Sequence, residues 1–538
     1  MLNRLFFTLM TSFLILTSCA EKQEVNTIHG TLLSCEGKPM QAADIKVYIF
    51  SSGIDTVNIK PDSDGKFDLI FADAEKITLN FHGADHISYT LPLFTNGIDE
   101  SFDLVVKLQA YILADDLTDV RVFGNFNEYD FHSSVQMMPD SKGIYHALVP
   151  NSKDTLSYQL LGIVGGGEER SVNGTTQDLL IFDGEGDYCS AIVTSEKEVN
   201  IIFDPAKKKY PLTELSVTSS DEQINSYIEK YSSRIKKNKQ NFKELDQAIA
   251  DRDTNKIESI FDKILSETEA LILDEKNEAA LSDLLMSYCE LYSIAYRHGI
   301  VRDHAAKIKT MIPKVLPASS AVWLDAKRMT AYAALIIGGE EAVNFLRELP
   351  KNHFSERQSV SIFYTSVELF SKTSDNKTRD KIFYLMRENH PDNSSTYRIG
   401  SRLCGEGKIV VGKQIPEFSV QSLDNPDVTI SSESLKGKYT LIDIWAVSCT
   451  PCRGEMEYLH AAYEKFKNKN FQMLSISFDK VAKAVELYRA KRWEMPWMNA
   501  FVEDGWNSKI KEAFEVYGIP RPVLIDPNGK ILAVDGNL

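Results

Sequence analysis

Near the end of the chain stands the sequence Leu441-Ile-Asp-Ile-Trp-Ala-Val-Ser-Cys-Thr-Pro-Cys-Arg-Gly-Glu455. Its first half shows little alternation of polar and apolar residues, which is typical of a parallel strand buried on both faces. Proline at position 451 suits the first turn of a helix, and the apolar residues that follow it recur at helical spacing. We therefore expect a buried strand, a short turn that carries two cysteines, and a helix that begins beside them.

The spacing of Cys449 and Cys452 places both thiols at the predicted start of this helix. Unpaired N–H groups and the positive end of the helix dipole favour negative charge there, and the thiolate is the reactive form of cysteine. A thiol in such a motif can reach a pKa of about 7, against about 8.5 for a free cysteine. Zinc sites also use C-x-x-C pairs, but no second Cys/His pair stands at zinc-finger spacing. We predict a redox pair and no metal.

Three segments resemble the signatures of the thioredoxin superfamily, namely Ile442-Asp-Ile-Trp-Ala446, Cys449-Thr-Pro-Cys452 and Gly518-Ile-Pro520. The resemblance implies that Cys449 attacks a substrate disulfide and that Cys452 resolves the mixed disulfide. It also implies that Asp443 is a buried acid, which can take the proton of the resolving thiol because burial raises a carboxyl pKa toward neutrality. A peroxiredoxin is a weaker interpretation, because no threonine stands three residues before Cys449.

The same resemblance assigns the substrate side of the site. Pro520 is expected as a cis-proline that faces the cysteines, and we count it among the catalytic residues. Ile519 would offer its backbone for strand-like pairing with a substrate peptide, and Trp445 is expected beside the disulfide as a second substrate-binding residue.

More narrowly, Cys-x-Pro-Cys-Arg-x-Glu, Ile415-Pro-Glu-Phe418 and Ile525-Asp-Pro-Asn-Gly529 are similar to membrane-attached thiol-disulfide oxidoreductases of the TlpA/ResA type. This resemblance covers residues 408–538. It implies a protein disulfide as substrate, an upstream thiol reductant such as a membrane electron donor, and no cofactor.

Residues 1–19 are predicted to be a lipoprotein signal peptide. Arg4 supplies a positive flank, and Leu5 to Leu16 is apolar but too short to span a bilayer. The sequence Leu16-Thr-Ser-Cys19 resembles a bacterial lipobox, which implies that Cys19 becomes a lipidated N-terminus. The alternative is an ordinary secretory signal. Because Ala20 rather than aspartate follows the cysteine, we expect a periplasm-facing lipoprotein, with the outer membrane favoured over the inner.

The chain of 538 residues is long enough for three or four domains, and its net charge of −16 argues against binding to nucleic acid. We predict a multidomain protein with N-terminal β-sandwich modules, a central all-α region and a C-terminal α/β thioredoxin-like domain. The expected boundaries are 1–19 for the signal peptide, 20–109 and 110–215 for two sandwiches, the second early-set or immunoglobulin-like, 216–405 for the helices and 408–538 for the redox domain. Cys35, Cys189, Cys289 and Cys404 are scattered among these segments, and no spacing pairs them.

Two functions fit these observations. The first is a lipid-anchored thiol-disulfide oxidoreductase that reduces or isomerises protein disulfides. The alternative is a glycan- or protein-binding lipoprotein with a degenerate redox domain, in which aromatic residues of the second sandwich stack on sugars. We expect Phe123, Phe126 and Tyr158 to be core residues instead, and both retained cysteines favour the first function.

Overall fold

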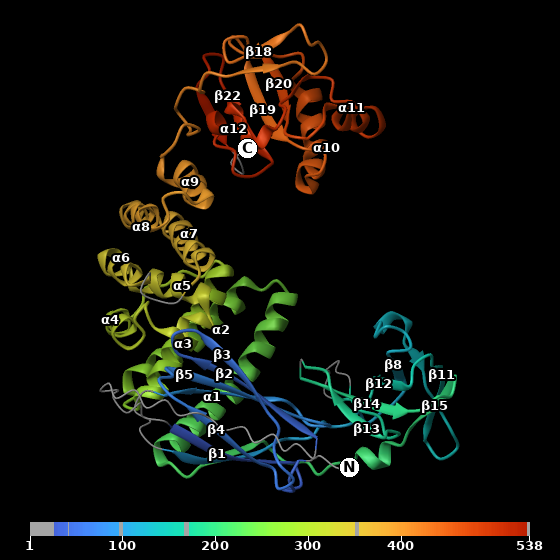
Figure 1. Cartoon of the computed structure of the whole chain (residues 1–538). Coiled ribbons are helices and arrows are strands. Elements are labelled where there is room, and N and C mark those ends of the chain that lie inside the picture. Colours follow the sequence, from blue (N-terminus) through green and yellow to red (C-terminus); the bar gives the residue numbers. More distant parts are fainter. Residues whose placement is uncertain are drawn as a thin grey trace, which may run out of the picture. The chain divides into compact units, whose positions relative to one another are not determined.

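The computed structural model describes residues 26–40, 42–95, 101–165, 172–184, 186–349 and 354–534. The chain divides into two compact units, one of residues 1–264 with 274–284 and one of residues 265–273 with 285–538. The β modules belong to the first unit, and the later helices and the redox domain belong to the second (Figure 1). Cys19 lies outside the described residues, and within them no helix is long and apolar enough to cross a bilayer.

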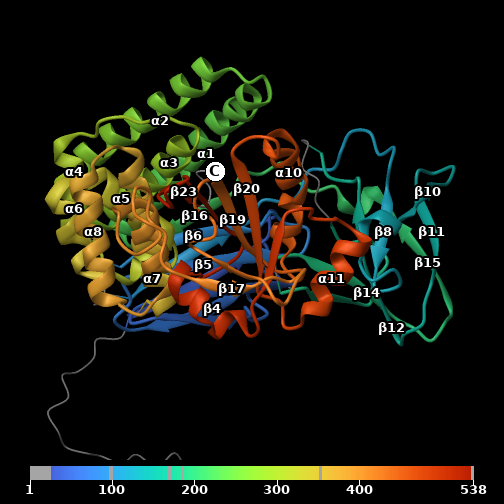
Figure 2. The same ribbon diagram turned by 90° about the horizontal axis from the view of Figure 1, so that it is seen from above.

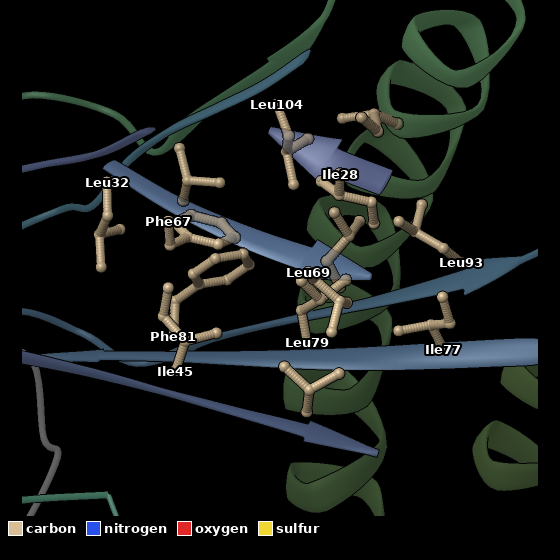
Figure 3. Packing of buried hydrophobic residues seen from close by; sticks show 14 of the residues in the cluster. Ile28, Leu32, Ile45, Phe67, Leu69, Ile77, Leu79, Phe81, Leu93 and Leu104 are labelled. Atoms are coloured by element: carbon tan, nitrogen blue, oxygen red, sulfur yellow. The ribbon is translucent and has the colours of Figure 1, made fainter. Parts of the chain in front are cut away.

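The first β module is a sandwich of two four-stranded sheets with strand orders β16-β7-β1-β4 and β3-β2-β5-β6. Its strands are β1 (Asn26–Leu33), β2 (Ala43–Phe50), β3 (Ile54–Ile59), β4 (Lys66–Phe71), β5 (Lys76–Gly83), β6 (Tyr89–Phe94), β7 (Phe102–Lys107) and β16 (Ser216–Ser219). Strand β4 buries every second residue, as a strand does when one face of its sheet covers a core. Figure 3 shows the core between the sheets, where Ile28 and Leu69 of one sheet meet Leu79 and Phe81 of the other.

The chain returns to this first module before the helices begin. Strand β16 pairs with β7, and Ile224, Tyr227 and Ile228 of helix α1 (Glu222–Ala250) are buried in the same core. The predicted boundary after residue 215 therefore misplaces both elements, because they complete the first sandwich. A four-residue strand whose partner is far away in the sequence leaves no local pattern that identifies it.

The second β module has a five-stranded sheet of order β13-β14-β12-β8-β9 and a three-stranded sheet of order β10-β11-β15. Its strands are β8 (Arg121–Gly124), β9 (Val135–Gln136), β10 (Met138–Pro139), β11 (Tyr145–Pro150), β12 (Thr155–Leu161), β13 (Leu179–Phe182), β14 (Tyr188–Val193) and β15 (Glu198–Phe203). Phe123 and Tyr158 are buried, and Phe126 is half-buried against the core. These three aromatics therefore contribute to packing, as expected, Phe126 only in part.

The helices after α1 are α2 (Thr254–Asp274), α3 (Glu278–Arg297), α4 (Ala306–Val315), α5 (Lys327–Ile337), α6 (Gly339–Arg347), α7 (Glu356–Lys372), α8 (Asn376–Asn389) and α9 (Ser394–Ile399). Helices α5, α7 and α8 lie side by side in both views (Figure 1 and Figure 2). Apolar residues at helical spacing, such as Phe363 and Phe370 of α7, are buried between them. After α9 the chain makes a π-helical turn over Gly400–Cys404 and enters the redox domain.

The redox domain is built on a five-stranded sheet of order β21-β20-β19-β22-β23. Its elements are the hairpin β17 (Ser419–Gln421) and β18 (Thr429–Ser431), the sheet strands β19 (Tyr439–Trp445), β20 (Phe471–Ser477), β21 (Met498–Phe501), β22 (Arg521–Ile525) and β23 (Ile531–Val534), and the helices α10 (Thr450–Phe466), α11 (Ala482–Lys491) and α12 (Lys509–Phe514). Strand β19 is central and runs parallel to β20 and antiparallel to β22. The expected α/β domain is therefore present.

Helix α12 is short. It stops at Phe514, and the chain reverses at Glu515, whose φ is 50°. The Glu515 carboxylate accepts the N–H of Lys408 at 3.0 Å and that of Ile409 at 3.3 Å. This contact with a distant segment stabilises a helix end that no local signal marks.

We expect the alternation in β4 to separate residues that stabilise the first sandwich from residues that do not. Leu69 is 2% exposed and Ile70 is 65% exposed. Leu69→Ala should lower the free energy of unfolding by about 2 to 5 kcal/mol, because it opens a cavity in the core. Ile70→Ala is the matched control and should change it by less than about 0.5 kcal/mol. Urea unfolding of both variants measures the difference, and equal effects would contradict the described core.

Candidate active site

The two cysteines lie where the buried central strand gives way to helix α10. Cys449 is the N-cap residue of α10, and its Sγ accepts the backbone N–H of Cys452 at 3.2 Å. Pro451 stands in the first turn, where its missing N–H leaves no intrahelical hydrogen bond unmade. The two sulfurs form a disulfide, with Cys452 buried and Cys449 partly exposed. Cys449 is thus the sulfur that another molecule reaches first.

The cis-proline loop faces this pair. The peptide bond between Ile519 and Pro520 is cis, and the Ile519 carbonyl oxygen lies 3.7 Å from Cys449 Sγ. The structure therefore brings the Ile519–Pro520 peptide, which follows Cys449 by some seventy residues, directly beside Cys449 Sγ. A backbone segment in this position can pair with an extended peptide that carries a disulfide.

Asp443 lies beneath helix α10. Side chains alternate along β19, so Asp443 shares a face of the sheet with Leu441 and Trp445, which pack against α10 in one cluster that includes Cys452. Its side chain is buried, and this burial, together with the negative charge of Glu455, raises its pKa to about 7. Burial also raises the pKa of Glu455 itself. Near neutral pH the Asp443 carboxyl is therefore balanced between accepting and donating a proton.

Trp445 packs beside the disulfide, as predicted, but its burial contradicts the predicted role in binding substrate. It is fully buried, and its ring lies 5.4 Å from that of Tyr488 on α11. Because it has no exposed surface, its side chain offers a substrate nothing to contact. It packs instead with Cys452 and Met456 under the first turns of α10.

Asp479 holds the loop that leads to Cys449, and the sequence analysis missed it. Its two carboxylate oxygens accept the Val447 N–H at 3.1 and 2.9 Å, and Ser477 Oγ donates to it at 2.9 Å. Asp479 is buried, so these hydrogen bonds are shielded from water. The available signal was a carboxylate two residues after the end of strand β20. Because β19 and β20 are parallel neighbours, they end at the same edge of the sheet, so a residue that follows β20 lies near the loop that follows β19.

Four further cysteines lie within the part of the chain that the structure describes. Cys35, Cys189 and Cys289 are buried and Cys404 is half-buried, all as free thiols. Burial is the main cause that raises the pKa of each of these thiols, to about 12 for Cys289 and Cys404. Within the part of the chain that the structure describes, no cluster of histidine, cysteine and carboxylate side chains could hold a metal.

The C-terminal region that contains this site is similar to known thiol-disulfide oxidoreductases. The AhpC/TSA family model matches residues 411–534. The thiol-disulfide oxidoreductase ResA of Bacillus cereus (strain ZK / E33L) is 30% identical over 125 residues, which cover 23% of this chain and 69% of that protein. ResA of Bacillus thuringiensis subsp. konkukian is 28% identical over 127 residues, or 24% and 70% of the two chains. A solved thiol-disulfide oxidoreductase from Bacteroides fragilis is 30% identical and matches 23% of this chain and 90% of its own, with a TM-score of 0.21.

The raised pKa of Asp443 predicts a pH-dependent effect of Asp443→Asn. The folded protein keeps this carboxyl protonated up to about pH 7, whereas its ordinary pKa is 3.8, so the unaltered protein loses stability as the pH rises between these values. Relative to that protein, the variant should gain about 2 to 4 kcal/mol of unfolding free energy between pH 4 and pH 8.

Urea unfolding followed by tryptophan fluorescence measures this gain, because only Trp323 of the five tryptophans lies outside the redox domain. Glu457→Gln, which alters an exposed carboxylate on α10, is the control and should show no such change. A variant whose stability relative to the unaltered protein is the same at both pH values would show that Asp443 is not held protonated.

Proposed function

The chain belongs, through its C-terminal domain, to the thiol-disulfide oxidoreductases of the ResA type, and we propose that it reduces or isomerises disulfides of other proteins through Cys449 and Cys452. The observation that carries the proposal is the arrangement around Cys449. A partly exposed sulfur at a helix N-terminus lies 3.7 Å from the carbonyl of a cis-proline loop and above a buried acid. A degenerate domain has no need to keep all of these groups together.

The reaction begins from the reduced pair. The Cys449 thiolate attacks one sulfur of a substrate disulfide, forms a mixed disulfide and releases the other substrate sulfur as a thiolate. Cys452 then attacks Cys449 Sγ, closes the disulfide that the structure shows and releases the second substrate thiolate. The substrate gains two electrons and the pair loses them. An upstream thiol reductant restores the pair by the same exchange in reverse.

Asp443 would serve the second step. Cys452 is buried and must lose its proton before it attacks, and Asp443 lies on the same covered face of the sheet. A carboxyl with a pKa of about 7 can accept that proton near neutral pH and return it in the reverse direction. Glu455, whose charge contributes to the raised pKa of Asp443, tunes this transfer.

We expect the purified chain to accelerate the reduction of insulin by dithiothreitol, measured as turbidity. Cys449→Ser should abolish the acceleration, because it removes the attacking sulfur. Cys452→Ala should instead accumulate a mixed disulfide with insulin, visible on a non-reducing gel. Cys404→Ser, which alters a half-buried free thiol, is the matched control and should retain full activity. Activity in the Cys449→Ser protein equal to that of the unaltered protein would contradict the proposal.

We propose that Cys19 carries a lipid anchor and that the protein faces the periplasm, with the outer membrane favoured. The support is the lipobox-like sequence Leu16-Thr-Ser-Cys19 behind a short apolar segment. Several acyl chains on one residue give stable anchoring, because a single chain binds a membrane only marginally. An anchored oxidoreductase would meet both exported proteins that contain disulfides and a membrane electron donor.

In a bacterial host, Cys19→Ser should move the protein from the membrane fraction to the soluble fraction and remove the incorporation of labelled palmitate. Cys404→Ser should leave both unchanged. An unlabelled protein that remains soluble with Cys19 intact would favour an ordinary secretory signal.

A further inference from the structure

A cavity of about 920 Å³ opens beside the cis-proline loop. At its redox end it is lined by Ile519, Pro520 and Tyr458 of α10. Leu441 and Leu524, which lie opposite each other on β19 and β22, line it from the sheet. The cavity thus continues directly from the backbone that lies against Cys449, and its surface is largely apolar there.

The opposite wall comes from the helical region. Two arginines contact the ring of Tyr364 on α7, with guanidinium carbons 5.5 Å (Arg398) and 5.7 Å (Arg402) from its centroid. Arg402 also donates a hydrogen bond to Glu368 of α7, which holds it in place. The ring of Tyr397 on α9 stacks at 5.3 Å on that of Tyr517 in the redox domain. In this unit the helices therefore form part of the surroundings of the redox site.

A second cavity, of about 470 Å³, shares Tyr364 and Arg398 with the first, so the two adjoin. Its other lining residues are polar or charged apart from Val360, and they include Arg357, Ser361 and Asn393. The one carboxylate among them, that of Glu356, accepts a hydrogen bond from Asn393. The first cavity is largely apolar near Ile519, but the carboxylates of Glu455 and Glu515 also line it, and that of Glu515 accepts the backbone N–H groups of Lys408 and Ile409. In the second cavity Arg357 and Arg398 outnumber Glu356, so the groove that the two cavities form carries its positive charge at this end, in a chain whose net charge is −16.

We propose that this groove binds an acidic segment of the protein whose disulfide is exchanged. A cysteine of the partner lies at Ile519, apolar residues beside it cover Leu441 and Leu524, and carboxylates further along meet Arg398 and Arg357. Opposite charges in such a groove select the partner and speed its encounter. The inference rests on the proposed oxidoreductase function and adds to it a class of substrate and a role for the helical region.

Two peptides test this selection. Each has a central cysteine linked by a disulfide to a fluorescent reporter, with glutamates on both sides in one peptide and glutamines in the other. The measured quantity is the ratio of kcat/KM for the glutamate peptide to kcat/KM for the glutamine peptide. We expect the unaltered protein to prefer the glutamate peptide by about tenfold, and added salt to reduce the preference.

The variant Arg357→Gln/Arg398→Gln should bring this ratio close to one. Arg402 is left intact because it also bonds to Glu368 within the helical packing. The control Lys509→Gln/Lys530→Gln removes the same charge at exposed positions outside the groove and should keep the preference. A ratio near one in the unaltered protein, or a preference that survives the arginine substitutions, overturns the docking proposal even while insulin reduction supports the redox function.

If neither the peptides nor insulin are reduced, the redox function fails, and docking is then judged by binding alone. Fluorescence anisotropy with the Cys449→Ser protein compares the two peptides without turnover. Tighter binding of the glutamate peptide, lost in the arginine variant, supports the groove. Equal binding of both peptides overturns it.

Discussion

The chemistry of this chain depends on where helix α10 begins. The Cys452 N–H donates to Cys449 Sγ, so the sulfur takes the position that a side-chain oxygen usually fills at a helix N-cap. That position exposes the sulfur to unpaired N–H groups and to the positive end of the helix dipole, and both stabilise a thiolate. Asp479 holds the preceding loop through the Val447 N–H, so the strand, the loop and the helix keep the sulfur at one place.

A second constraint is the burial of the Asp443 carboxyl on the face of the sheet that helix α10 covers. Burying Asp443 in a largely apolar strand destabilises its charged form, and the fold keeps this carboxyl buried nonetheless. Local rules of protein structure are commonly broken where function requires it. Here the consequence is a carboxyl whose pKa is about 7, on the same covered face of the sheet as Cys452, from which the proposed mechanism requires a proton to be removed.

The groove beside the redox site is lined by residues of the redox domain and of the helical region. Arg398 and Arg402 from the end of the helical region stand over the same groove as the cis-proline loop, whereas the β sandwiches have cores of their own. This arrangement separates two tasks. In the proposed function, Cys449 and its neighbours exchange the disulfide, and the groove that α7 and α9 help to line selects the partner. A redox domain of the same family with another companion region would then exchange disulfides with other proteins.

Local patterns in the sequence were sufficient for the strand and the helix that carry the two cysteines. The buried strand, the proline in the first helical turn and the periodic apolar residues of the helices depend on near neighbours, and they predicted β19, α10 and the central helical region. The pairing of β16 with β7, the end of α12 at Phe514, the burial of Trp445 and the hydrogen bonds of Asp479 were decided only by the tertiary structure. Each depends on contact between residues far apart in the chain, and such contacts leave no periodic trace in the sequence.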